Sequence, residues 1–382
     1  EIVKQIGPCL ILAASIVGTG ELINTTLLGA KAGYALLWLM LLSCFVKVFV
    51  QIELGRYALA SGKTTLTMIK EVPKVGAFFT WAWLIMMFAT QNQIGVMIGG
   101  TGYTLAKMLG FENSTTLFAV IITFLTIVLL VRGSYGLIER LTTMLVGLFT
   151  LITVLCVIFI LKTPQAFTWA DIGEGMQFTF PAGAMVIALS AIGITGVGAS
   201  ELVAYPYWCL EKGYALRVGP TEQTEQWENR AKGWLRVMKV DAWLSMVVYT
   251  LATIAFYLLG AATLQGKSPS EMEALQKIDN LIPTLGEMYQ PVLGEQGAII
   301  FITIGAFIVL YSTLFAATAG NSRISADFLH VNHFVRFQNH QERTKWVSIC
   351  CVFFPILGLA LFLLIDKAAL MVFIGGIAQV MM

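Results

Sequence analysis

The sequence Gly18-Thr19-Gly20-Glu21-Leu22 interrupts a long apolar run near the start of the chain, and Gly198-Ala199-Ser200-Glu201-Leu202 interrupts another in its second half. Each places one carboxylate beside glycines in a stretch long enough to cross a bilayer. An ionised side chain at bilayer depth costs about 3 kcal/mol on insertion scales, so such residues usually face a cavity, a partner or a substrate. Two carboxylates in matched positions therefore predict one shared site.

The composition is that of a protein solvated by lipid. Of the 382 residues, 57% are hydrophobic and 12% are charged, and the mean hydropathy is +0.79. Because a span takes about 20 apolar residues, we predict an all-α integral membrane protein whose first partner is the bilayer. The ten predicted spans are 6–30, 33–55, 76–106, 115–131, 138–161, 181–213, 239–264, 297–322, 345–365 and 367–382. We expect the tenth to be truncated at the end of this sequence.

The orientation follows from the placement of Lys and Arg, since the net charge of +2 decides nothing. Segments that follow the even-numbered spans are basic, and we predict that they are cytoplasmic, as is the N-terminus with Lys4. We expect the protein to reside in the plasma (inner) membrane. The basic residues of these segments are Arg56, Lys63, Lys70, Lys74, Arg132, Arg140, Lys212, Arg217, Arg230, Lys232, Arg236, Lys239, Arg323, Arg336, Arg343 and Lys345.

The ten spans divide into two sets of five. Laid over each other, the spans of 6–161 and 181–382 bring Glu21 and Glu201 to the same place in the first span of each set. An odd number of spans inverts the second copy, which is the inverted-repeat arrangement of many transporters. We therefore predict a single transport domain made of repeats 1–165 and 166–382.

Glycines predict that spans 1 and 6 are discontinuous. Gly18, Gly20, Gly196 and Gly198 weaken helix locally. Non-helical backbone at that depth is tolerated only where it lines a cavity or packs within protein. The two breaks are thus expected to meet near the midplane, where unwound carbonyls and helix ends are available to a substrate.

Two structural alternatives stay open. Small residues can simply be packing contacts between helices, and we prefer that interpretation for Gly29, Gly33, Gly99, Gly100, Gly375 and Gly376. Packing explains neither carboxylate, however. A structural Glu21 would need a basic partner in the membrane, and Lys47 in the second span is the plausible one.

The chain resembles the Nramp family of divalent-metal transporters. The resemblance begins with Gly7-Pro8, Gly18-Thr19-Gly20-Glu21, Gly29-Ala30-Lys31-Ala32-Gly33-Tyr34 and Leu36-Leu37-Trp38. It continues through Ser61-Gly62-Lys63, the break in the sixth span and the basic run from Arg230 to Asp241, and so covers nearly the whole chain. It implies a LeuT-type fold, a 5+5 inverted repeat with discontinuous spans 1 and 6.

The resemblance also shows how the first span departs from the family. Nramp proteins carry Asp-Pro-Gly-Asn at this break. The metal-binding Asp corresponds to Gly18, the Pro to Thr19 and the metal-binding Asn to Glu21. One carboxylate has therefore moved by three positions.

The sixth span departs in the same way from the family's Met-Pro-His-Asn. The metal-binding Met corresponds to Gly198, the Pro to Ala199, the His to Ser200 and the Asn to Glu201. The thioether and the imidazole are gone. The resemblance aligns Gln379 with the family's tenth-span glutamine.

The third span has no acidic residue between Phe88 and Gly102, although Nramp proteins place proton-pathway carboxylates in this helix. It offers the amides of Gln91, Asn92 and Gln93 instead. Because amides cannot relay charge by protonation at physiological pH, we predict that transport does not follow the family's proton-coupled scheme.

The expected ligands are oxygen atoms. Carboxylate, carbonyl and water suit Mg and Mn, whereas a thioether favours softer ions, so Glu21 and Glu201 are the candidate metal residues and the favoured substrate is a hard divalent cation. Glycine at 18 and 198 is expected to enlarge the site, so that an ion keeps several waters. A larger cavity could equally take an amino acid or an organic cation, and fold alone does not choose between them. The full candidate set is Glu21, Glu201, Gly18, Thr19, Gly198, Ser200 and Gln379.

We predict a secondary transporter that works by alternating access, with no resident cofactor. The alternatives are a transporter of a small organic solute and a transport-inactive sensor or scaffold. Enzyme and nucleic-acid functions find no support, because the three histidines, His330, His333 and His340, share one loop and topology explains the basic loops. The oligomeric state stays open.

Overall fold

The computed structural model describes residues 18–111, 113–132, 135–163, 167–222, 224–266, 277–365 and 367–382, together with Pro8, Ile16, Glu271 and Leu275. For 135–143, 145, 146 and 149 it describes the backbone alone. Helices are the regular secondary structure of these ranges. Cys9, Lys4 and most of the first half of span 1 lie outside them.

Within the described residues, each predicted span coincides with helix. Six helices among the described residues are long and apolar enough to cross a membrane, which supports an integral membrane protein. The elements, in the order of the ten spans, are η2 (Gly20–Thr25) with α2 (Thr26–Ala32), α3 (Leu37–Ser61), α5 (Gly76–Met108), α6 (Thr115–Arg132), α7 (Tyr135–Ile160), α9 (Met185–Ile194) with α10 (Ala199–Glu211), α12 (Glu225–Leu264), α15 (Gln290–Val331), α16 (His340–Leu364) and α17 (Ala368–Val380).

Some helices extend beyond the apolar runs that predicted them. Helix α12 begins at Glu225 rather than near residue 239, because Thr224 caps it by accepting a hydrogen bond from the Trp227 N–H at 3.2 Å. Its first turns are polar, so hydropathy could not mark them. Short helices lie between the spans: α4 (Thr65–Glu71), α8 (Trp169–Glu174), α11 (Tyr214–Val218) and α14 (Ile278–Glu287).

Span 6 is broken, as predicted. Helix α9 ends at Ile194 and α10 begins at Ala199, with non-helical backbone between them. Gly196 has a φ of 66°, a left-handed conformation in which glycine carries no steric penalty. At the break, the Gly196 N–H and the Thr195 carbonyl bond side chains, those of Glu21 and Lys47, instead of helical partners.

Span 1 has its own irregularity in the same region. After a turn at Gly18, whose N–H donates to the Ile16 carbonyl at 2.7 Å, the chain forms the π-helix η2. The Thr25 hydroxyl bonds the Gly20 carbonyl at 3.2 Å, five residues back. Such wide turns are rare and occur often at functional sites.

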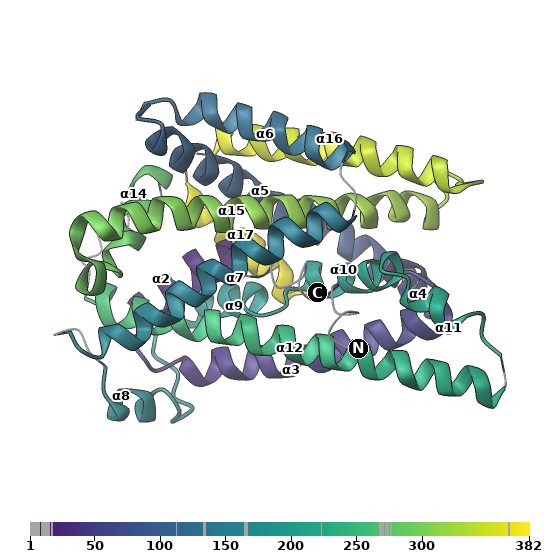
Figure 1. Cartoon of the computed structure of the whole chain (residues 1–382), viewed down its shortest axis with the longest axis horizontal. Coiled ribbons are helices and arrows are strands. Elements are labelled where there is room, and N and C mark those ends of the chain that lie inside the picture. Colours follow the sequence, from purple (N-terminus) through teal and green to yellow (C-terminus); the bar gives the residue numbers. More distant parts are fainter. Residues whose placement is uncertain are drawn as a thin grey trace.

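The bundle has three layers (Figure 1). Helices α3 and α12 lie along one face and α6 and α16 along the other. Between them lie α5, α15 and α17, and η2 contacts α9, α12 and α17. The two irregular segments are therefore in the interior of the bundle. The division into repeats 1–165 and 166–382 stays a prediction.

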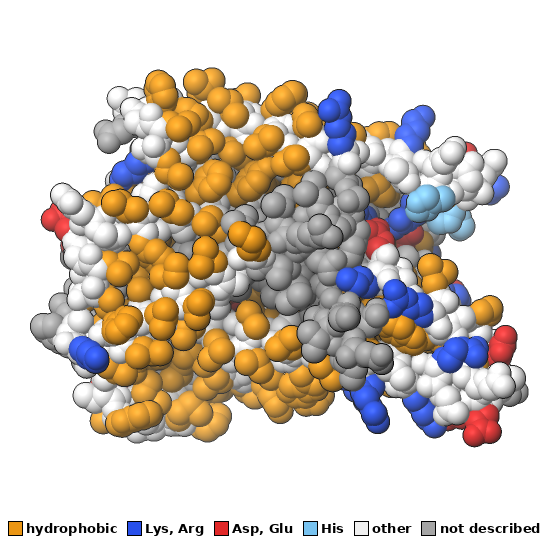
Figure 2. Space-filling view, in the orientation of Figure 1, with side chains coloured by type: hydrophobic (Ala, Val, Ile, Leu, Met, Phe, Trp, Pro, Cys, Tyr) orange, Lys and Arg blue, Asp and Glu red, His pale blue; other side chains and the backbone are white. Residues whose placement is uncertain are grey.

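The surface has a broad apolar belt and one basic end (Figure 2). Large exposed side chains such as Ile85, Phe78 and Phe124 are 71%, 69% and 68% exposed, which only lipid can solvate. Lysine and arginine gather at the end formed by α4, α11 and the first turns of α12 and α16. An apolar belt with charge at the ends is the surface of a membrane-spanning protein.

Candidate functional site

Glu21 lies in η2 and is fully buried. Its Oε1 accepts hydrogen bonds from the Gly196 N–H at 3.2 Å and from the Thr253 hydroxyl of α12 at 3.4 Å. Its Oε2 has no hydrogen-bond partner among the described residues. A buried carboxylate oxygen without a partner is costly, so Glu21 Oε2 is an unsatisfied acceptor of the candidate site.

Glu201 lies in the first turn of α10, where a helix N-terminus favours negative charge. The Ser200 hydroxyl is 2.8 Å from Glu201 Oε2 and 3.0 Å from Gln379 Oε1. One hydroxyl proton serves only one of them at a time. The Ser200 N–H also donates to Gln379 Oε1 at 3.3 Å, so α17 is tied to the break in span 6.

A chain of amides continues from Gln379 into span 3. Its Nε2 donates to Gln93 Oε1 at 3.3 Å, and Gln93 Nε2 in turn lies 3.5 Å from the Val372 carbonyl. Gln93 is thus part of the polar network around the site. The sequence presents Gln93 only as a group that cannot titrate; the signal that points to a polar network is the run of amides Gln91-Asn92-Gln93 inside an apolar span.

The glycines of the two motifs are places of close approach. A Cβ on Gly18 would collide with the Thr313 side chain of α15, and one on Gly198 with Gln379 Oε1 and Glu201 Oε2. The expectation that glycine at both positions enlarges the site is therefore wrong, because neighbouring side chains fill the space. Thr19 is buried beside them and precedes η2 without capping it through its side chain.

Lys47 of α3 does not form the suspected ion pair with Glu21. No ion pair joins these two residues, both of which the structure describes. The Lys47 ammonium instead donates to the carbonyls of Ile192 and Thr195, the latter at 2.8 Å. Lys47 nevertheless interacts electrostatically with Glu21 and Glu201, and Glu201 with Glu21. Glu21, Glu201 and Lys47 therefore lie within electrostatic reach of one another at the break in span 6.

This arrangement can bind a cation, but with few protein charges. The described residues contain no group of three or more His, Cys, Asp or Glu side chains that could hold a metal. An ion here would need hydroxyl, amide, carbonyl or water oxygens besides Glu21 and Glu201, which is how Mg²⁺ is usually bound.

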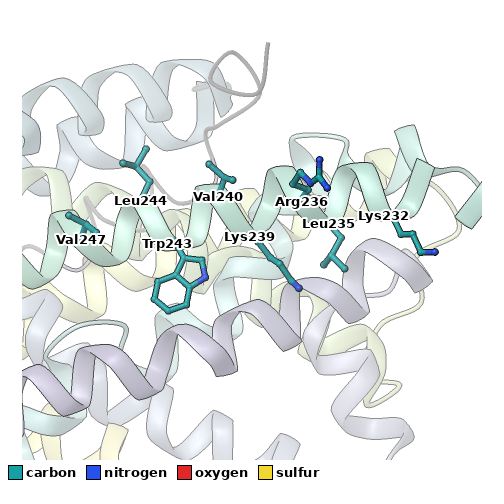
Figure 3. A pocket seen from close by; sticks show the side chains of 8 residues that line it. All are labelled: Lys232, Leu235, Arg236, Lys239, Val240, Trp243, Leu244 and Val247. Atoms are coloured by element: carbon teal, nitrogen blue, oxygen red, sulfur yellow. The ribbon is translucent and has the colours of Figure 1, made fainter. Parts of the chain in front are cut away.

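A hollow lies elsewhere, on the surface of α12 (Figure 3). It measures about 590 Å³ and is lined by Lys232, Leu235, Arg236, Lys239, Val240, Trp243, Leu244 and Val247. Its lining combines basic side chains with apolar ones and includes neither Glu21 nor Glu201, so it is not the predicted site.

Comparison with known proteins identifies the family. Residues 9–382 match the sequence model of the family described as natural resistance-associated macrophage protein-like, or Nramp. The chain belongs to the Nramp family. Nramp proteins are membrane transporters and not enzymes, so this Nramp protein is a membrane transporter. The resemblance deduced from the sequence is confirmed.

Individual relatives are distant. An uncharacterized protein of Pasteurella multocida strain Pm70 is 24% identical over an alignment of 386 positions, which covers 95% of this chain and 78% of the relative. The manganese transporter of Eremococcus coleocola, solved with an aromatic bis-isothiourea compound, is similar with a TM-score of 0.66 at 14% identity, over 97% of this chain and 76% of that one. MhsT in complex with L-phenylalanine is similar with a TM-score of 0.57 at 15% identity, over 98% of this chain and 87% of that one. These similarities confirm the LeuT-type fold.

Proposed function

We propose that this Nramp protein is a secondary transporter that moves a divalent cation by alternating access through the site between η2 and the α9–α10 break. The observation that carries the proposal is Glu21, fully buried with one carboxylate oxygen unpartnered among the described residues. Family membership supports it, and so does the similarity to a protein named as a manganese transporter.

The ligand chemistry favours a hard ion such as Mg²⁺ or Mn²⁺. Glu21, Glu201, Ser200 and Gln379 offer oxygen atoms, and Gly198 supplies no sulfur. Oxygen ligands suit Mg and Mn, while thioethers favour softer ions. Waters would complete the coordination of the ion.

A small organic solute, such as an organic cation or an amino acid, is the second candidate. What favours it is the lack of a cluster of three or more metal-ligating side chains among the described residues, together with a cation, Lys47, near the carboxylates.

A flux screen in proteoliposomes tests both candidates. Uptake of Mg²⁺, Mn²⁺, Ca²⁺ and Cd²⁺ is measured beside uptake of amino acids and organic cations. We expect uptake of Mg²⁺ or Mn²⁺ that is lost in Glu21→Gln and kept in Glu53→Gln, the same change at an exposed carboxylate paired with Arg56. Uptake of an organic solute alone would establish the second candidate. No flux of any tested solute from folded, reconstituted protein would indicate a sensor or scaffold.

We further propose that the basic end of the bundle is cytoplasmic, that the protein resides in the plasma (inner) membrane, and that the repeats are 1–165 and 166–382. The supporting observation is the gathering of Lys and Arg at that end (Figure 2), since positive residues are retained on the cytoplasmic side.

A further inference from the structure

Lys47 is a lysine inside an apolar span, half-buried, and its partners are unusual. Helix α3 spans Leu37–Ser61, and Lys47 lies near its middle. Its ammonium donates to two main-chain carbonyls, those of Ile192 and Thr195, at the end of α9. Thus the ammonium of a lysine from span 2 bonds the backbone of the break in span 6.

These carbonyls form the kind of place where a cation binds. The last carbonyls of a helix have no intrahelical donor, and the C-terminal end of a helix carries partial negative charge. In transporters with broken helices, unwound carbonyls and half-helix C-terminal ends coordinate a small coupling cation. Here an ammonium on a side chain stands in that position.

The same peptide group connects Lys47 to Glu21. The carbonyl of Thr195 accepts from Lys47 at 2.8 Å, and the N–H of Gly196, on the other side of that peptide bond, donates to Glu21 Oε1 at 3.2 Å. Hydrogen bonds in such chains polarise one another. The cation therefore fixes the orientation of the peptide that holds Glu21, and its charge reaches both Glu21 and Glu201.

We propose that Lys47 is a tethered cation that occupies a monovalent-cation site at the α9–α10 break, and that removing its charge opens this site to a free ion such as Na⁺. The inference extends the proposed function, because it assigns to span 2 the residue that sets the charge of the transport site. It concerns ion binding at the break and can be measured without any transported substrate.

Purified protein in detergent provides the test, with Na⁺ exchanged for choline at constant ionic strength. We expect the melting temperature of the unmodified protein to be the same in both salts. Lys47→Met should melt lower in choline and recover saturably as Na⁺ is added, because an ion that binds only the folded state stabilises it. Lys47→Arg, which keeps the charge, should not respond to Na⁺.

The control is Lys31→Met, a lysine in the last turn of α2 with an exposed side chain, which should show no Na⁺ dependence. A folded Lys47→Met that responds to none of Li⁺, Na⁺ and K⁺ would overturn the proposal. If Lys47→Met does not fold, binding of radioactive Na⁺ to the unmodified protein tests the proposal instead. Saturable binding at the break would contradict it, because the Lys47 ammonium would then not fill the cation site. A Na⁺ response in a protein without metal flux would leave this inference standing and remove the proposed function alone.

Discussion

At the scale of single residues, Glu21 and Glu201 hold different positions although their motifs match. Glu21 is enclosed and bonds the backbone of the opposite break through one oxygen, leaving the other unpartnered within the described chain. Glu201 is partly exposed and bonded to Ser200. Glu21 therefore combines full burial with a free ligand atom, and Glu201 is the more accessible carboxylate.

Glu21→Gln and Glu201→Gln are expected to weaken Mn²⁺ or Mg²⁺ binding by tenfold or more, about 1.4 kcal/mol or above. Each amide removes a negative charge and keeps the shape, so thermal stability in detergent should stay nearly unchanged. Titration calorimetry and a melting curve measure the two effects, with Glu53→Gln as the control. Unaltered metal affinity in both variants would remove the carboxylates from the site.

Selectivity also depends on single residues. Titration of the unmodified protein should show Mg²⁺ or Mn²⁺ bound more tightly than Cd²⁺, since the candidate ligands offer oxygen and no thioether. Tight Cd²⁺ binding with no detectable Mg²⁺ or Mn²⁺ binding would contradict the hard-ion proposal. Binding of no metal at all would favour the organic solute.

The sequence suggests that Gly198→Met would restore a sulfur ligand and shift preference towards Cd²⁺. In the structure a Cβ at this position would displace Gln379 Oε1 and Glu201 Oε2, the ends of two side chains that are themselves candidate ligands. We expect a loss of about 1 to 3 kcal/mol in stability from overpacking and no gain in Cd²⁺ affinity. A melting curve with and without Cd²⁺ measures both.

At the scale of elements, α5 joins the site through amides. Gln93 lies in the network with Gln379 and Ser200, and α5 carries no carboxylate. Span 3 therefore shapes the site without supplying a titratable group, in contrast to what the resemblance implies for the family.

We accordingly predict no substrate-driven proton influx through span 3. A pH-sensitive dye trapped in proteoliposomes should report no acidification beyond that of empty vesicles while substrate enters. Substrate-dependent acidification would count against this prediction, unless Glu21→Gln or Glu201→Gln abolished it and thereby traced it to those carboxylates.

At the basic end, hydrogen bonds to Asp327 connect α15 with α10 and with the residue before α4. Asp327 of α15 is buried and accepts hydrogen bonds from Tyr207 of α10, at 2.8 Å, and from Thr64, which precedes α4. Tyr207→Phe should lower the free energy of unfolding by about 1.5 to 3 kcal/mol, the range for hydrogen bonds to charged groups. Thermal unfolding measures it against Tyr57→Phe, whose hydroxyl bonds the exposed Glu71 at 3.3 Å. Equal melting temperatures would show that the tie adds no stability.

At the scale of the whole molecule, the apolar belt and the basic end fix how the bundle sits in a membrane (Figure 2). The five described cysteines are buried, and labelling of the unmodified protein, which also contains Cys9, sets the background. A membrane-impermeant maleimide should label Lys162→Cys on intact cells and Lys232→Cys only in inverted vesicles. The opposite pattern would invert the proposed topology.

The sequence by itself determined the class of fold, the spans among the described residues, the break in span 6 and the site of irregular backbone in span 1. These follow from properties that are local along the chain: apolar length, glycine conformational freedom, and the rarity of carboxylates in lipid. The break between Ile194 and Ala199 and the position of Glu21 in an irregular turn were accessible in this way. The Nramp resemblance rested on the same local motifs.

Only the tertiary structure decided how the site is built. Lys47 bonds the carbonyls of span 6 rather than Glu21, Gln93 enters the network through Gln379, and neighbouring side chains fill the space beside Gly18 and Gly198. These contacts join residues that are far apart in the sequence. A long side chain can reach several partners, and its position in the sequence does not say which one it contacts. Packing chooses the partner, because every buried polar group must find its hydrogen bonds among the atoms that the fold places within reach.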